Sequence, residues 1–367
     1  MIASPLCIAD RPGHRARTLR RTCPIQRLRG GERHHFFGYY NKSAWDRTGR
    51  YLLGNEVAMM DAPLTPDLRA NVGYFDLKDR ELFHAIDTTT AWNWQMGCQL
   101  QWLDGEPGHK FIYNIRTDDM SARYPGFGAI VFDIDSGKKT ALSMPVYVCA
   151  PDSRYALCVD YRRLYVTHET IGYAEHDETC FLHRLITMNA DGSGMRLLEC
   201  SDHPLPQLAD DFDPSAVGTF DYEKSEYQIS HPLWQDDAHI VAWSPHAGSI
   251  HYHLYEDADD GQVEVIGRDL LTENGHMSFS PVDTRWLLSD TYPDSRTNTR
   301  ILFIYDMREG VRYEIGEFHA PPELKKENRC DLHPRWNRDG LAVCIDSVHE
   351  GERQMYVIDV SQITGAR

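Results

Sequence analysis

Six polar side chains occupy one position of a sequence pattern that recurs along the chain. Each lies three residues before the aromatic residue that precedes an Asp/Gly turn, or before Ala150 in the third copy. They are Lys42, Gln99, Tyr147, His231, His276 and His333. Equivalent positions of strands around a common axis converge, and three imidazoles beside a phenol suit metal binding or acid–base chemistry. A solvated channel lining is the alternative interpretation.

A thiol extends this set of candidate ligands. Cys330 precedes His333 by three residues in the segment RCDLHPRW. With His231 and His276, these residues offer three imidazoles and one thiolate, which is a ligand set for tetrahedral zinc. We therefore expect a divalent metal, zinc before manganese, and no organic cofactor. If His231 is not bound to the metal, its imidazole is a candidate general base.

Tyr147 and Arg163 form a second candidate pair. They are sixteen residues apart, which suits the inner strand of one repeat and the turn that follows it. A guanidinium beside a phenol lowers the pKa of the phenol, and it can also bind a carboxylate through two hydrogen bonds. The alternative is a structural tyrosine and a surface arginine.

The recurring pattern also predicts the elements that position these residues. Its copies, each a strand, an aromatic residue, a turn and a strand, are residues 40–57, 98–115, 145–161, 230–245, 275–292 and 332–348. Hairpin patterns with period-two alternation lie between most of them, at 72–87, 128–143, 185–200 and 301–316, and a last strand is expected at 353–360. These features predict antiparallel four-stranded units.

The spacing of the turn aspartates sets the expected number of units. The six aspartates are Asp46, Asp104, Asp152, Asp236, Asp283 and Asp339, and their spacings are 58, 48, 84, 47 and 56 residues. Because 84 is close to two repeats, we expect a seventh, degenerate unit near residues 162–225. The prediction is an all-β, single-domain, seven-bladed β-propeller over residues 34–367. A β-sandwich with coincidental turns is the alternative.

Charge is distributed unevenly along the chain. Residues 1–33 hold eight arginines and two carboxylates, which gives +6, so the remaining residues carry −23 of the total of −17. We expect residues 1–33 to be a flexible basic tail, with a functional basic arm or a start assigned too far upstream as alternatives. The acidic body argues against nucleic acid as a partner, because phosphate binding needs a basic face.

The composition of the chain also leads to expectations about its cellular compartment and its oligomeric state. No run approaches the ~20 apolar residues of a membrane-spanning helix, and the arginine-rich start is not followed by the apolar stretch of a secretory signal. Nine cysteines without a CxxC pair are typical of thiols in a reducing compartment. We therefore expect a cytoplasmic protein without a membrane partner, plausibly a monomer.

The segments HHFFGYYNKSAWDRTGRYLL, TAWNWQMGCQLQW and PVYVCAPDSRYAL, with the three His-bearing strands, resemble the seven-bladed β-propeller polysaccharide lyases over residues 34–362. That superfamily includes oligogalacturonate, ulvan and rhamnose-glucuronate lyases. In the oligogalacturonate branch, the resemblance implies that His231 is the base and His276 a metal ligand. The Gln-x-x-His-x-His run of that branch reads Cys330 to Arg335 here, which departs from its manganese site.

The ulvan and rhamnose-glucuronate branches match this departure better. There, a Cys and His site resembles a structural zinc site, and a tyrosine and an arginine sixteen residues apart serve as acid/base and carboxylate neutraliser. Transferred to this chain, those roles fall on Tyr147 and Arg163. The pair of histidines that those lyases use upstream of the tyrosine has no clear match here.

The resemblance implies β-elimination on an acidic oligosaccharide that contains a uronate. Lys42, Gln99, Arg335 and His35 are the candidate substrate-binding residues, and Tyr147, Arg163 and His231 the candidate catalytic ones. A related propeller α-L-rhamnosidase makes His34 or His35 an alternative catalytic residue. A non-catalytic carbohydrate- or protein-binding propeller is the third possibility.

Overall fold

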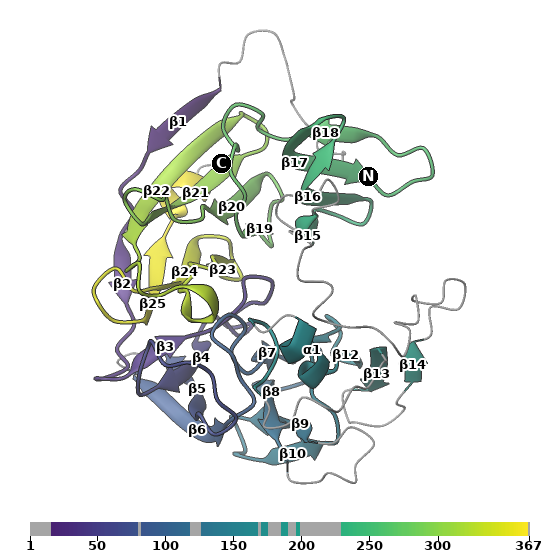
Figure 1. Ribbon diagram of the computed structural model, residues 1–367, viewed down its shortest axis with the longest axis vertical. Coiled ribbons are helices and arrows are strands. Elements are labelled where there is room, and N and C mark those ends of the chain that lie inside the picture. Colours follow the sequence, from purple (N-terminus) through teal and green to yellow (C-terminus); the bar gives the residue numbers. More distant parts are fainter. Residues whose placement is uncertain are drawn as a thin grey trace.

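The chain folds into six small β-sheets that follow one another around a ring (Figure 1). The computed structural model describes residues 16–79, 82–117, 126–167, 170–174, 185–189, 196–198 and 229–365. Helices are few and short: α1 (Tyr161–Thr167), the 3₁₀ helix η3 (Lys326–Asn328) and α2 (Ser361–Thr364). No described helix has the length and apolar character needed to cross a membrane.

The first three sheets are antiparallel and four-stranded. The first contains β3 (His34–Phe36), β4 (Tyr51–Val57), β5 (Ala70–Asp76) and β6 (Phe83–Thr89). The second contains β7 (Gln101–Trp102), β8 (Lys110–Arg116), β9 (Phe127–Asp133) and β10 (Lys139–Leu142). The third contains β11 (Val148–Cys149), β12 (Tyr155–Cys158), β13 (Leu185–Asn189) and β14 (Arg196–Leu198).

The other three sheets repeat this order of strands. The fourth contains β15 (Ser230–Trp234), β16 (His239–His246), β17 (Ser249–Glu256) and β18 (Val263–Val265). The fifth contains β19 (Met277–Phe279), β20 (Trp286–Asp290), β21 (Thr299–Asp306) and β22 (Val311–His319). The sixth contains β23 (Arg335–Trp336), β24 (Ala342–Ser347) and β25 (Gln354–Asp359). Each copy of the sequence pattern thus begins one sheet, which confirms an all-β fold of propeller type.

The seventh blade stays a prediction. In the interval 162–225, strand β13 pairs with β12 and β14 pairs with β13, so these two strands complete the third sheet and do not start a new one. The rest of that interval beyond residue 198 lies outside the described residues. The described part of the chain therefore holds six sheets.

The expected basic tail is corrected by the structure. Strand β1 (Arg17–Arg20) pairs in parallel with β22, and β2 (Ile25–Arg27) pairs with β25 and completes the sixth sheet. Arg20 lies 3.0 Å from the carboxylate of Glu317, and Arg27 pairs with Glu352. The arginines therefore pair with an acidic body, and β2 joins the early chain to its last sheet. Residues 1–15 lie outside the described residues.

Two local interactions fix the inner strands. The turn aspartates 46, 152, 236, 283 and 339 each accept a hydrogen bond from the backbone N–H two residues ahead, as Asx turns do. The indole of Trp102 donates to the carbonyl of Ala44, and that of Trp336 to the carbonyl of Ser278. Each bond joins the aromatic residue of one sheet to the residue before the aromatic in the preceding sheet. The two bonds therefore fix the register of the inner strands in these two pairs of neighbouring sheets.

Candidate functional site

The six polar side chains predicted from the repeat lie in two groups at the inner strands. In the first, the lysine group (Lys42, Gln99 and Tyr147), the Lys42 amine donates to Gln99 at 2.7 Å and lies 5.2 Å from the centre of the Tyr147 ring. In the second, the histidine group (His231, His276 and His333), ring centres are 4.7 Å apart for His231 and His276 and 4.5 Å apart for His276 and His333. The repeat thus brought together side chains that are distant in the sequence.

Two tyrosines that the sequence reasoning missed pack against the histidine group. The Tyr40 ring lies 5.6 Å from His231 and 5.3 Å from His276, and the Tyr39 ring lies 5.0 Å from His333. Gly38 precedes them with φ of 123°, and a Cβ there would lie 2.6 Å from the backbone of Met96. In the sequence, the glycine before two tyrosines could have indicated this tight turn, because only glycine fits the backbone conformation there.

The backbone is unusual at the same repeat position of three sheets. Gln99, His231 and His333 have φ of 61°, 54° and 42°, in the left-handed region that side chains other than glycine rarely adopt. Such a conformation costs on the order of 1–3 kcal/mol and persists where the surrounding structure imposes it. Its recurrence shows that the ring position has its own backbone geometry, distinct from that of a regular strand.

His276 and His333 present free imidazole nitrogens within a buried cluster. Asp290 lies 3.0 Å from Nδ1 of His276 and also accepts its backbone N–H, which leaves Nε2 of His276 available. Nε2 of His333 is buried and has no hydrogen-bond partner among the described residues. Ligand atoms of His276, His333 and Asp331 all lie within 4.8 Å of one another. Two imidazoles and one carboxylate, with Asp290 orienting His276 and one imidazole nitrogen left without a partner, fit a divalent cation.

The predicted fourth ligand, Cys330, is corrected to Asp331. Cys330 is buried in an apolar cluster with Ala320, Leu324 and Val348, and burial raises the pKa of its thiol. Ligand atoms of Asp331 and His333 belong to one cluster with His276, and the Cys330 sulfur is not part of it. His231 is not one of the three clustered ligands. A zinc site with a thiolate is therefore not what these residues form, while a divalent metal remains compatible with them.

Asp331 is held as a carboxylate by two guanidinium groups. Arg300 donates to Oδ1 at 3.0 Å, and Arg329 contacts both carboxylate oxygens at 2.7–2.8 Å. Burial alone would raise the pKa of Asp331, but the charge of Arg329, with that of Arg300, keeps the pKa well below its usual value. The carboxylate therefore stays charged in a fully buried position.

His231 has the geometry of a neutral proton acceptor. Its Nδ1 lies 3.0 Å from Oδ1 of Asn274 and 3.1 Å from Oγ of Ser230, contacts that are both satisfied by the tautomer with the hydrogen on Nδ1 and the lone pair on Nε2. Burial, with the nearby His276, lowers the pKa of His231 to about 3. Nε2 makes no hydrogen bond to the described residues. His231 was predicted both as a metal ligand and, if not bound to the metal, as a general base; the clustered ligand atoms do not include it, and this arrangement is compatible with the second role.

The lysine group comes from the first three copies of the repeat, at the same position as the histidines in the other three. Burial lowers the pKa of Lys42 to about 7 and raises the pKa of Tyr147, which is therefore protonated at neutral pH. Lys42 also lines a cavity of about 220 Å³. Arg163 lies in helix α1, where a turn was expected, and its side chain is outside the described residues, so its pairing with Tyr147 stays a prediction.

Two predicted substrate-binding residues have structural roles instead. Arg335 is 1% exposed, and its guanidinium bonds to Asp346 at 2.8 Å and to the carbonyl of Gly38 at 2.8 Å. His35 is fully buried, with its two ring nitrogens 3.1 Å from Gln354 and 3.2 Å from Glu56. Neither side chain is accessible to a substrate. The alternative that made His35 catalytic is wrong for the same reason.

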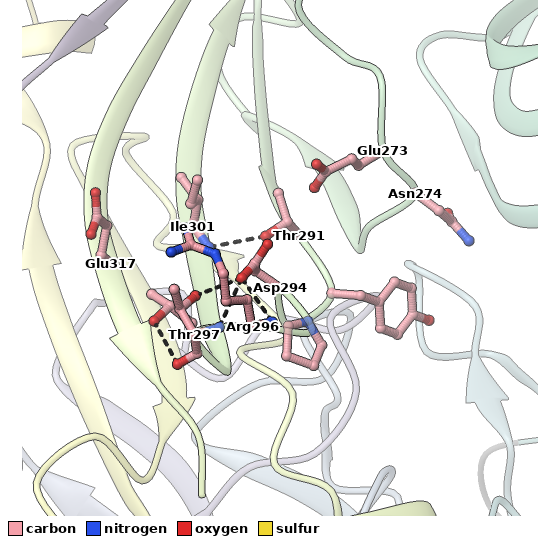
Figure 2. A pocket seen from close by; sticks show the side chains of 11 residues that line it. Glu273, Asn274, Thr291, Asp294, Arg296, Thr297, Ile301 and Glu317 are labelled. Atoms are coloured by element: carbon pink, nitrogen blue, oxygen red, sulfur yellow. Dashed lines mark hydrogen bonds between the residues drawn. The ribbon is translucent and has the colours of Figure 1, made fainter. Parts of the chain in front are cut away.

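A cavity of about 540 Å³ opens beside the histidine group (Figure 2). Asn274 and Tyr292 belong to its lining, and they also contact the site: Asn274 bonds to His231, and the Tyr292 ring lies 5.5 Å from that of His276. Figure 2 shows Glu273 and Asn274 on one side and Asp294 and Glu317 on the other. This volume accommodates one or two sugar rings next to the candidate base.

Searches with protein-family models and among curated proteins find no match to this chain. Solved structures similar to it include an oligogalacturonate lyase in complex with manganese, with 14% identity, coverage of 92% of this chain and 93% of that chain, and a TM-score of 0.41. An oligogalacturonate lyase from Vibrio parahaemolyticus has 12% identity, 92% and 94% coverage and a TM-score of 0.40. A gluconolactonase from Xanthomonas campestris has 10% identity, 92% and 89% coverage and a TM-score of 0.40. These proteins differ in their reactions, and TM-scores this low assign no activity to this chain.

Binding of a divalent metal is the first testable consequence of the cluster. We expect purified protein to bind one Mn²⁺ or Zn²⁺ per chain, because two free imidazole nitrogens and a charged carboxylate converge there. His333→Ala should weaken this affinity by about 10²-fold or more, while the Cys330→Ser variant should keep it. Calorimetry and metal analysis measure both, and loss of binding in Cys330→Ser alone would contradict the assignment.

Proposed function

We propose that this protein is a lyase that cleaves a uronate-containing oligosaccharide by β-elimination. One observation carries the proposal: His231, whose Nε2 makes no hydrogen bond to the described residues, lies next to residues that could hold a divalent cation and near a sugar-sized cavity. β-Elimination needs these parts together, because the proton at C5 of a uronate becomes acidic only when its carboxylate is neutralised.

The chain's own residues would move two protons. His231 accepts the C5 proton at Nε2, the C4–C5 double bond forms, and the bond between C4 and its oxygen breaks. Asn274 keeps the imidazole in the tautomer that this step needs. Tyr147, protonated because burial raises the pKa of its phenol, donates the second proton to the departing oxygen.

Cations complete the site. His276, Asp331 and His333 would hold the divalent ion, which when bound stabilises negative charge as a Lewis acid. Lys42 adds a titrating amine next to Tyr147. The proposal thus keeps the predicted roles of His231 and Tyr147 and moves the metal ligands from Cys330 to Asp331.

Incubation with a panel of uronate oligosaccharides tests the proposal. We expect an unsaturated product that absorbs near the ultraviolet edge and whose mass, together with that of its partner, equals the mass of the substrate. Release of free rhamnose without an unsaturated sugar would favour a hydrolase instead. Binding without turnover of any member of the panel would favour a non-catalytic propeller.

The pH dependence of turnover reports on Lys42. The pKa of about 7 means that the amine loses its charge above neutral pH in the free protein, so its attraction for a carboxylate declines there. We expect kcat/KM to fall by about tenfold per pH unit on the alkaline side. Lys42→Arg keeps a positive charge at high pH and should shift this decline upward. An unchanged alkaline limb in that variant would show that another group titrates.

A further inference from the structure

Arg329 lies next to Tyr292, a residue that lines the cavity and also contacts the histidine group. Its guanidinium carbon lies 5.4 Å from the centre of the Tyr292 ring, and Tyr292 both lines the cavity and contacts the rings of His231 and His276. The side chain is 32% exposed, so it is the accessible member of the pair of arginines that bind Asp331. Arg300, the other member, is buried.

Asp331 fixes the orientation of this guanidinium. Nε of Arg329 donates to both oxygens of the carboxylate and Nη2 forms an ion pair with Oδ2 at 2.7 Å, whereas Nη1 makes no hydrogen bond to the described residues. A guanidinium clamped along one edge has its remaining N–H groups directed away from the clamp, and it loses little further freedom when it binds an anion. The arrangement therefore offers a preorganised donor next to Tyr292, which lines the cavity.

The charge of Arg329 also acts on the candidate base. Arg329 is among the groups that depress the pKa of His231, so the two side chains lie within electrostatic range of each other. In a β-elimination, the carboxylate is attached to the carbon whose proton is removed, so the group that binds it must lie close to the base. The family resemblance assigned this role to Arg163, whose side chain lies outside the described residues, whereas Arg329 is described and its charge acts on His231.

We propose that Arg329 binds the carboxylate of the uronate whose C5 proton His231 removes, with Asp331 as its positioning residue. This inference rests on the proposed function and assigns a residue within it. It makes the free acid, and not the uronate methyl ester, the preferred ligand of the site. The permanent guanidinium charge supplies this preference at any pH at which the protein is folded.

Binding of simple uronates tests this inference without turnover. The probes are the methyl glycosides of glucuronic and galacturonic acid and their methyl esters, which carry no leaving sugar at C4. We expect Arg329→Gln to weaken binding of the preferred acid by about 10²-fold and binding of its ester by less than threefold. Arg329→Lys should recover part of the affinity, and the surface variant Arg308→Gln should bind like the unaltered protein.

The comparison of acid with ester within one variant separates recognition from folding. Equal losses for acid and ester in Arg329→Gln would overturn the inference, since a structural defect affects both ligands alike. An unaltered affinity for the acid would also overturn it. If Arg329 shows the expected selectivity but no oligosaccharide yields an unsaturated product, the proposed lyase reaction fails while carboxylate recognition by Arg329 stands.

Discussion

His231→Gln is expected to lower kcat for formation of the unsaturated product by about 10²- to 10⁴-fold, with little change in KM. Glutamine occupies similar space in the buried position next to Asn274, but its amide does not accept a proton at neutral pH. The substrate would then bind and remain intact. Single-turnover absorbance measurements with saturating oligosaccharide give the rate of the chemical step directly.

The exposed His319 provides a matched control, because His319→Gln makes the same exchange outside the site. We expect that variant to keep the unaltered kcat. Full activity in His231→Gln would remove His231 as the base and leave the lysine group as the source of the proton acceptor. A raised KM with unaltered kcat would instead assign His231 to binding.

The sequence predicted the convergence of the polar ring because the repeat has a fixed register. Asx turns and the indole bonds of Trp102 and Trp336 hold each inner strand at the same height, so equal positions in the pattern became neighbours in space. This is why His231, His276 and His333, separated by 45 and 57 residues, were recognisable as one group without a structure. Their roles in turnover stay predictions.

The sequence-based predictions were wrong where the alternation of side chains along a strand is interrupted, or where a strand pairs with a partner far away in the sequence. His333 has left-handed backbone, so side-chain alternation does not continue from it to Arg335, which points into the core. Cys330 was preferred as a ligand for its chemical softness, although its neighbour Asp331 shares a side with His333. Strands β1 and β2 were missed because they are short and polar and gain their stability from distant partners.

The second large expected effect is a loss of stability when the buried ion pair of Arg335 and Asp346 is broken. Arg335→Met should lower the free energy of unfolding by about 3–5 kcal/mol, because it leaves a buried carboxylate without its countercharge. Asp346 also accepts the backbone N–H groups of Phe37 and Gly38, and Arg335 donates to the Gly38 carbonyl, so the pair anchors the turn that precedes Tyr39. Urea unfolding, followed by tryptophan fluorescence, measures the loss.

A double variant distinguishes charge burial from simple loss of packing. In Arg335→Met/Asp346→Asn, the amide oxygen still accepts the backbone N–H groups but no longer carries a charge, so we expect part of the lost stability to return. Arg308→Met, at an exposed position, should stay within about 0.5 kcal/mol of the unaltered protein. If Arg335→Met instead kept full stability and raised KM alone, the sequence-based assignment of Arg335 to substrate binding would be restored. Other interactions would then have to stabilise the turn that precedes Tyr39.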